Sequence, residues 1–170
     1  MNSYIEHYLR ILKHCYLNPE PEMVWLKSLK ISINTAIDCG ANRGYISHVL
    51  ASHADQVFSF EPIPYLAEYL TNVLPKNCQV INSALSDFEG HADLKIPVNK
   101  GREDITALAT LSDKNVLKSG SDVMDFRCVN IPVVKLETFS KEQNLSSLDY
   151  LKIDVEGNEV GVFVGLALSK

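Results

Sequence analysis

The sequence lacks the long apolar runs and the charge bias that mark membrane and nucleic-acid-binding proteins. Its longest apolar stretch, Val160 to Leu168, falls far short of the roughly 20 residues that a transmembrane helix requires. Glu6 and His7 interrupt the segment in which a secretory signal peptide would need an apolar core. The net charge of -5 disfavours a nucleic-acid partner, because such proteins normally carry a basic surface. We therefore expect a cytoplasmic protein with no membrane span and no nucleic-acid partner.

Cysteines are few, and the chain contains no internal repeat and no low-complexity tract. The four cysteines are widely spaced and match no metal-binding or redox motif. What is present is an ordinary globular composition, with 46% hydrophobic and 22% charged residues in a chain of 170. This length is close to that of one domain, and it is sufficient to bury a hydrophobic core.

The spacing of apolar residues divides the chain into two parts. Residues 1–33 are expected to form an N-terminal helical segment, because apolar side chains recur at helical spacing over Tyr4–Lys13 and again after Pro21. In residues 34–170, short apolar strands alternate with helical segments, which is typical of βαβ units. The expected strands are Thr35–Asp38, Gln56–Glu61, Gln79–Ala84, His91–Ile96, Phe126–Val134 and Leu148–Asp154; the expected helices are Tyr45–Ala54, Tyr65–Leu74 and Gly157–Leu168. This order predicts an α/β domain with a mainly parallel sheet and helices on both faces.

Two features in the second half depart from this alternation. Residues Pro97–Asp125 have weak periodicity and contain glycine, serine, aspartate and lysine, so we expect a long loop that serves as a lid or a binding segment. The strand Phe126–Val134 contains Pro132, which cannot donate a ladder hydrogen bond. We therefore expect that strand at the edge of a sheet.

The strongest functional signal is the turn that follows the first expected strand. It runs from Asp38 to Gly44 and has glycine at Gly40 and at Gly44. Glycine permits positive φ and a close approach of the backbone to a ligand, and the start of the next helix offers unpaired N–H groups to an anionic group. The alternative is an ordinary βα turn that contains glycine for conformational reasons alone.

An acidic residue, Glu61, ends the second expected strand. A carboxylate at this place, about 20 residues beyond a glycine-containing turn, can accept hydrogen bonds from both hydroxyls of a ribose. On its own such an acid is more often a solvated residue at a strand end. In combination with the turn, it favours a nucleoside-containing cofactor.

The positions of the glycines argue against a dinucleotide. The dinucleotide motif G-x-G-x-x-G requires three glycines, whereas the corresponding positions hold Gly40, Asn42 and Tyr45. A nicotinamide-dependent oxidoreductase is therefore disfavoured. Asp38, which precedes the first glycine by two residues, suits a cofactor that carries an amino group, and S-adenosylmethionine has one.

Four short segments, in order along the chain, carry a resemblance to a known family. They are Asp38–Tyr45, Phe60–Pro64, Asn82–Asp87 followed by Gly90, and Leu151–Glu159. Together they resemble the FkbM family of S-adenosylmethionine-dependent methyltransferases, from about Thr35 to the end of the chain. The first segment is shared by many methyltransferases, whereas the K-I-D-V-E-G run within the last is much more particular to this family.

The resemblance implies a Rossmann-like class I methyltransferase fold, S-adenosylmethionine as cofactor, and transfer of a methyl group to a hydroxyl of a sugar, a polyketide or another small molecule. We therefore expect a small-molecule or glycan acceptor as partner. Matched position by position, the resemblance implies that Asp38 supports the amino group of the cofactor and that Glu61 binds its ribose. It also implies residues that hold the methionine part and residues that flank the adenine: Gly40, Asn42 and Gly44 for the first, and Ala84 and Leu85 for the second.

Two acids in the K-I-D-V-E-G run, Asp154 and Glu156, are the candidate catalytic residues. They follow an expected strand, at the end where open α/β sheets place their ligands. A hydroxyl that attacks a methyl group must lose its proton, which favours a nearby base, and Asp154 is the first candidate for that role and Glu156 the second. The alternative is that Asp154 only orders the turn and that Glu156 faces solvent or caps the next helix. No histidine lies beside them in the sequence, and we assign no metal ion.

Members of the family normally continue beyond the segment that contains Asp154, whereas this sequence ends at Lys170. We therefore expect the C-terminal strands of the sheet to be missing, which would leave an apolar strand at an edge and favour self-association through that edge. Two hypotheses follow. The chain is either a methyltransferase domain complete enough to bind its cofactor, or a truncated non-catalytic remnant or interaction module that retains the fold.

Overall fold

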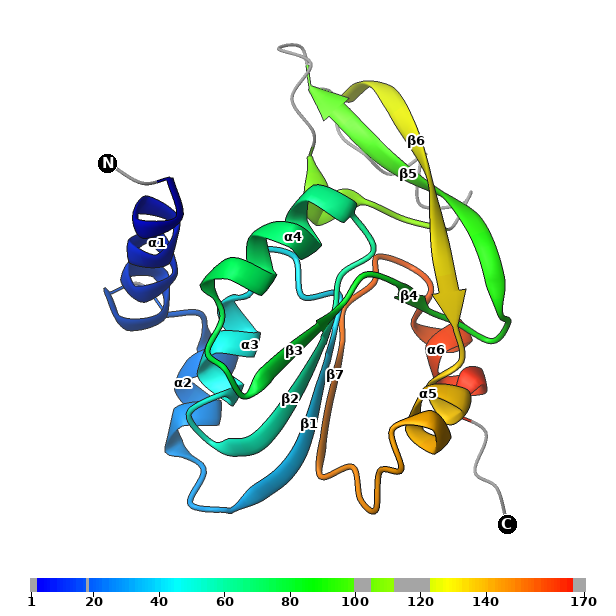
Figure 1. The fold of residues 1–170 in the computed structure, drawn as a ribbon. Helices are drawn as coiled ribbons and strands as arrows, with labels where there is room; N and C mark the ends of the chain where they lie inside the picture. The colour runs from blue at the N-terminus through cyan, green and yellow to red at the C-terminus, as the bar shows by residue number, and fades with distance from the viewer. Residues whose placement is uncertain (1–2, 18, 100–104, 112–122, 167–170) are drawn as a thin grey trace. The chain divides into compact units, whose positions relative to one another are not determined.

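The computed structural model describes residues 3–17, 19–99, 105–111 and 123–166. The chain divides into two compact units, one formed by Met1–Asn82 with Leu145–Lys152 and the other by Ser83–Asn144 with Ile153–Lys170. Each unit has its own sheet, as Figure 1 shows. The chain thus forms an α/β structure whose four-stranded sheet is mainly parallel and flanked by helices, in agreement with the Rossmann-like fold expected from the sequence.

The sheet of the first unit has the strand order β3-β2-β1-β7. Its strands are β1 (Ile33–Cys39), β2 (Ala54–Phe60), β3 (Cys78–Ile81) and β7 (Tyr150–Ile153). β1, β2 and β3 are parallel to one another. The backbone N–H of Asp149 donates to the carbonyl of Thr35, and Lys152 lies beside Asp38, so β7 runs in the same direction as β1. The carboxyl ends of these strands consequently meet at one edge of the sheet.

Four helices belong to this unit: α1 (Ser3–Leu17), α2 (Pro21–Ser28), α3 (Tyr45–Leu50) and α4 (Pro64–Val73). Their buried side chains form a core with one face of the sheet, whose members include Ile11 of α1, Met23 of α2, Leu50 of α3, Ala36 of β1 and Val57 of β2. The helices expected in residues 1–33 are thus present, and they share a core with β1 and β2. The domain boundary between residues 33 and 34 stays a prediction.

The helix α3 is shorter than the sequence predicted. The expected helix extended to Ala54, but α3 ends at Leu50 and Ala54 is the first residue of β2. Apolar spacing did not mark this boundary, because Ala54 is buried in the same core cluster as the residues of α3.

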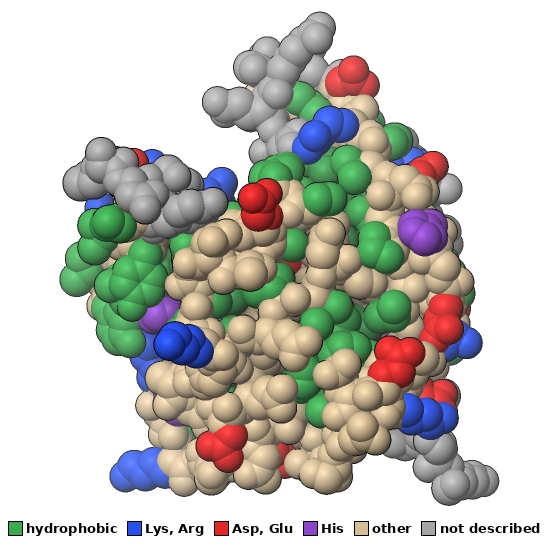
Figure 2. Space-filling view, viewed as in Figure 1, with side chains coloured by type: hydrophobic (Ala, Val, Ile, Leu, Met, Phe, Trp, Pro, Cys, Tyr) green, Lys and Arg blue, Asp and Glu red, His purple; other side chains and the backbone are tan. Residues whose placement is uncertain are grey.

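The outer side of α1 carries apolar side chains that are exposed, among them Ile5, Leu9 and Leu17. Figure 2 shows hydrophobic side chains gathered over this helix. None of the helices in the described part of the chain has the length and the apolar character needed to cross a membrane.

The second unit contains a three-stranded sheet with the order β4-β6-β5. β5 (Gly90–Asn99) and β6 (Val123–Val134) form a long antiparallel pair, and β4 (Ala84–Leu85) pairs in parallel with the end of β6. A short 3-10 helix (Thr106–Leu108) and the helices α5 (Leu136–Glu142) and α6 (Glu159–Gly165) complete the described part of this unit.

Two expectations for this region were wrong. The loop expected over Pro97–Asp125 is wrong at both ends, because Pro97–Asn99 continues β5 and Val123–Asp125 begins β6. Residues 100–104 and 112–122 of the expected range lie outside the described residues. β6 is the central strand of its sheet rather than an edge. The carbonyl of Pro132 points to the β4 side, where it accepts a hydrogen bond from Ser83 Oγ. The nitrogen of a strand residue points to the same side as its carbonyl. The missing N–H of Pro132 therefore faces the side where regular pairing with β4 begins only at Val133.

Candidate functional site

The turn after β1 has an unusual backbone that glycine makes possible. Gly40, Asn42 and Gly44 have positive φ values of 81°, 48° and 77°. The N–H groups of Gly40 and Ala41 both donate to the carbonyl of Phe60, at 3.1 and 2.9 Å, which ties the turn to the end of β2. A Cβ atom at Gly44 would lie 2.6 Å from Leu70 Cδ2, closer than packed atoms allow. The positive φ thus favours glycine at position 44, and a side chain there would also force Leu70 to move.

Glu61 is nearly enclosed, with an exposed fraction of 3%, and it binds the same turn. Its Oε2 accepts a hydrogen bond from the backbone N–H of Asn42 at 2.7 Å, and its Oε1 accepts one from the N–H of Ile63 at 2.9 Å. Burial raises the pKa of Glu61 to about 7, although both backbone hydrogen bonds favour the ionised form. The negative charge of Asp38 raises this pKa further, and the positive charge of Lys152 lowers it.

Asp38 is fully buried and belongs to a chain of polar side chains that starts inside the sheet. Ser59 Oγ donates to Ser47 Oγ at 2.8 Å, and Ser47 Oγ donates to Asp38 Oδ2 at 2.6 Å. The other oxygen, Oδ1, accepts no hydrogen bond from the described residues but lies 3.2 Å from Lys152 Nζ, which balances its charge. Lys152 Nζ also donates to the carbonyl of Gly40 at 2.9 Å.

Sequence reasoning missed Lys152. Its side chain comes from β7, retains 11% exposure and contacts both the acid and the first glycine of the turn. The only available signal was its place in the K-I-D-V-E-G run, where a lysine lies between two apolar residues of a strand that was expected to be buried. A lysine almost never lies in such a place without a partner of opposite charge.

The other two predicted acids lie in the second unit, in the loop before α6. Asp154 is exposed and Glu156 is half-buried. Glu156 has a φ of 52°, a left-handed conformation that is uncommon for residues other than glycine and concentrates at functional sites. Burial raises the pKa of Glu156, and the charges of Asp154 and Glu159 raise it further. A carboxyl group with this pKa direction accepts a proton more readily than a free glutamate does.

Ala84 and Leu85, which the sequence predicted to flank an adenine, form the short strand β4 and are both buried. The side-chain amide of Asn158 donates to the carbonyl of Leu85 at 3.3 Å and to Ser86 Oγ at 3.1 Å. The structure therefore links β4 with the loop of Asp154 and Glu156. It likewise links Asp38, Gly40, Asn42, Gly44 and Glu61 within the first unit. The binding roles assigned to these residues stay predictions.

The left-handed Glu156 is held by Thr110, a residue of the segment that the sequence predicted as a lid or binding segment. Thr110 is 2% exposed, and its Oγ1 donates to the carbonyl of Glu156 at 2.6 Å. We expect Thr110→Val to lower the free energy of unfolding by about 1 kcal/mol, because a partly buried carbonyl loses this donor. Chemical denaturation followed by circular dichroism measures this loss. Thr110→Ser retains the hydroxyl and serves as the control, so equal stability of the two variants would contradict the assignment.

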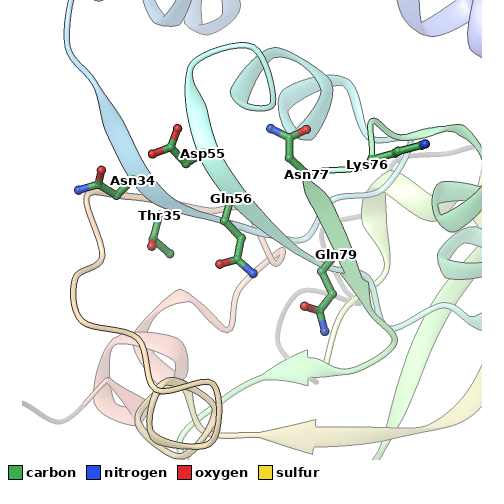
Figure 3. Close-up of a pocket in the computed structure, with 7 residues that line it drawn as sticks. All are labelled: Asn34, Thr35, Asp55, Gln56, Lys76, Asn77 and Gln79. Atoms are coloured by element: carbon green, nitrogen blue, oxygen red, sulfur yellow. The ribbon is translucent and has the colours of Figure 1, made fainter.

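A polar hollow of about 540 Å³ lies elsewhere in the first unit. Figure 3 shows its lining side chains, which come from the amino ends of β1, β2 and β3: Asn34, Thr35, Asp55, Gln56, Lys76, Asn77 and Gln79. Open α/β sheets bind their ligands outside the carboxyl ends of the strands. None of the predicted site residues lines this hollow, so it is distinct from the candidate site. Within the described residues, no group of three or more histidine, cysteine, aspartate or glutamate side chains is arranged to hold a metal ion.

A parallel α/β sheet with a glycine turn after β1 and a buried acid after β2 places the chain in the class of Rossmann-like α/β proteins. Comparison with known families makes this more specific: the methyltransferase FkbM domain matches residues 38–170. The chain therefore belongs to the FkbM methyltransferase domain family, as the resemblance of its four segments indicated. Neither the curated proteins nor the solved structures yield a significant match.

Proposed function

We propose that this domain is an S-adenosylmethionine-dependent methyltransferase that methylates a hydroxyl group of a sugar, a polyketide or another small molecule. The observation that carries the proposal is the contact between the glycine turn and the acid after β2, in which Asn42 N–H donates to Glu61 Oε2 at 2.7 Å. This contact joins the two sequence signals for a nucleoside cofactor. Membership of the methyltransferase family makes the sulfonium cofactor the best candidate among nucleosides.

The residues present fit such a cofactor. A carboxylate offers about four lone-pair positions, and backbone N–H groups occupy two of those on Glu61, one on each oxygen. The remaining positions suit the two hydroxyls of a ribose. Gly40 has no side chain that could obstruct the methionine part, whereas the missing side chain of Gly44 makes room for Leu70 of α4. The positive φ of the turn residues turns their peptide groups out of the strand direction.

In this proposal the cofactor, when bound, supplies a methyl group that is already electrophilic. The chain would contribute binding, alignment and removal of water, and these account for most of the acceleration of such a transfer. Asp154 would accept the proton of the acceptor hydroxyl, and Glu156 is the second candidate because its pKa is raised. The loop that carries both acids follows directly on β7.

Isothermal titration with S-adenosylhomocysteine tests the proposal. We expect binding by the wild type and a loss of binding in Glu61→Ala, with Glu142→Ala, a change at an exposed carboxylate of α5, as matched control. A wild type that does not bind, or a Glu61→Ala variant that binds equally well, would overturn the cofactor assignment. Transfer of a labelled methyl group to hydroxylated acceptors then distinguishes an enzyme from a domain that binds without turnover.

A further inference from the structure

We propose that Lys152 is a positioning residue of the cofactor-binding turn, and that Asp38 acts through Lys152 instead of binding the amino group of the cofactor itself. This inference rests on the proposed function, since it concerns how the same turn is held ready for S-adenosylmethionine. It assigns a role to a residue that the sequence analysis did not select.

The position of the Lys152 ammonium is the first support. It lies 2.9 Å from the carbonyl oxygen of Gly40 and 3.2 Å from Asp38 Oδ1. The peptide group after Gly40 is therefore fixed from outside the turn, at a residue with a φ of 81°. A charged hydrogen bond to a carbonyl is stronger than a neutral one, so Lys152 restrains the turn at its first glycine.

The enclosure of Asp38 is the second support. Its side chain has no exposed surface, and both oxygens face groups of the protein: Oδ2 accepts from Ser47 Oγ, and Oδ1 faces Lys152 Nζ. The positive charge that a buried carboxylate needs is thus provided by the chain itself. An amino group of a cofactor would have to displace Lys152 to reach this carboxylate.

The charges around Glu61 are the third support. Among the described residues, the charged groups that act on Glu61 are Asp38 of β1 and Lys152 of β7. Lys152 favours the ionised form of Glu61 and Asp38 disfavours it. Lys152 therefore holds the turn at Gly40 and also favours the carboxylate that would receive the ribose.

The experiment measures the dissociation constant of S-adenosylhomocysteine by titration for Lys152→Met, Asp38→Asn and the double variant. Lys141→Met, which removes an exposed lysine from an ion pair on α5, is the control and is expected to bind as the wild type does. We expect Lys152→Met to weaken binding about 10- to 100-fold, which is the usual effect of removing a hydrogen bond from a charged group. The double variant removes both charges, so it leaves no unpaired buried ion and remains a folded test if a single variant unfolds.

The two roles of Asp38 predict different results for the double variant. If Asp38 acts through Lys152, the double variant binds about as weakly as the single variant with the lower affinity, because both changes disrupt the same Asp38–Lys152 interaction. If Asp38 contacts the cofactor directly, the two losses multiply, and the proposal is overturned. Lys152→Met that binds with wild-type affinity would also overturn it. If the wild type itself does not bind S-adenosylhomocysteine, the proposed function is wrong, and the inference that rests on it is wrong as well.

A pH profile separates positioning from simple packing. The midpoint pH at which S-adenosylhomocysteine binding changes with Glu61 ionisation should rise in Lys152→Met, because the cation that favours the ionised form is lost. It should fall in Asp38→Asn, because a like charge is lost. Shifts in opposite directions support the proposal, whereas unchanged midpoints in both variants would contradict it.

Discussion

Raising the pH from about 4.5 to about 7 is expected to destabilise the folded chain by about 3 kcal/mol through Glu61, since burial raises the pKa of this carboxyl from 4.5 to about 7. Between these values the folded state holds a proton that the unfolded state has released. The free energy of unfolding therefore falls as the pH rises through this window, and the contribution of Glu61 is constant above about pH 7.

Urea denaturation at a series of pH values measures this dependence. Glu61→Gln cannot ionise, so it should lose this part of the slope, while Glu89→Gln, a change at an exposed acid, should retain it. A wild type whose stability rises across the window, with no change in slope in Glu61→Gln, would show that the two backbone hydrogen bonds outweigh burial. In that case Glu61 would be ionised throughout the physiological range.

The second large effect is expected at Gly165, in the last turn of α6. A Cβ atom there would lie 2.0 Å from the backbone oxygen of Ser86 and 2.9 Å from its carbonyl carbon. Because backbone atoms cannot rotate away as side chains do, Gly165→Ala must displace α6 from residue 86. We expect a loss of about 3 kcal/mol in the free energy of unfolding, which exceeds the gain of about 1 kcal/mol from the higher helix propensity of alanine.

Gly161→Ala is the matched control for this prediction, because it lies on the same helix. A Cβ atom at Gly161 would meet Asn158 Oδ1 at 2.5 Å and Ser86 Oγ at 3.0 Å, and both atoms are ends of side chains that can turn aside at the cost of the hydrogen bond between them. Its cost should therefore be clearly smaller in a thermal unfolding experiment. Equal melting temperatures for the two variants would mean that α6 does not pack against residue 86 as described.

The sequence predicted the α/β alternation, and it contained the two signals from which we propose the cofactor site, because both are local. The turn at Gly40 and Gly44 and the acid at Glu61 are each readable from neighbouring residues in the chain. The family was likewise confirmed by the match over residues 38–170. The central position of β6 was not predictable, since its partner β4 consists of two residues, Ala84 and Leu85, and a strand so short has no pattern of its own.

The contacts between the residues of the candidate site could not be predicted from the sequence either. Lys152 contacts Asp38 only because β7 is the neighbour of β1 in the sheet, and strand order depends on the tertiary fold. The same holds for Glu61: its position after β2 was predicted, but the two N–H groups that it binds depend on the path of the turn. Lone-pair occupancy and burial, which decide the pKa, are properties of that path.

The separation of β7 from β1 along the chain has a consequence for how the protein is made. Lys152 follows Gly40 by 112 residues, and ribosomes add roughly 5 to 20 residues per second, so the cation emerges on the order of 6 to 22 s after the turn that it restrains. During that interval the nascent strands carry a carboxylate with no counter-charge at hand. Asp38 must remain hydrated until β7 arrives, so the turn at Gly40 reaches its restrained form only after the segment Tyr150–Ile153 has been synthesised.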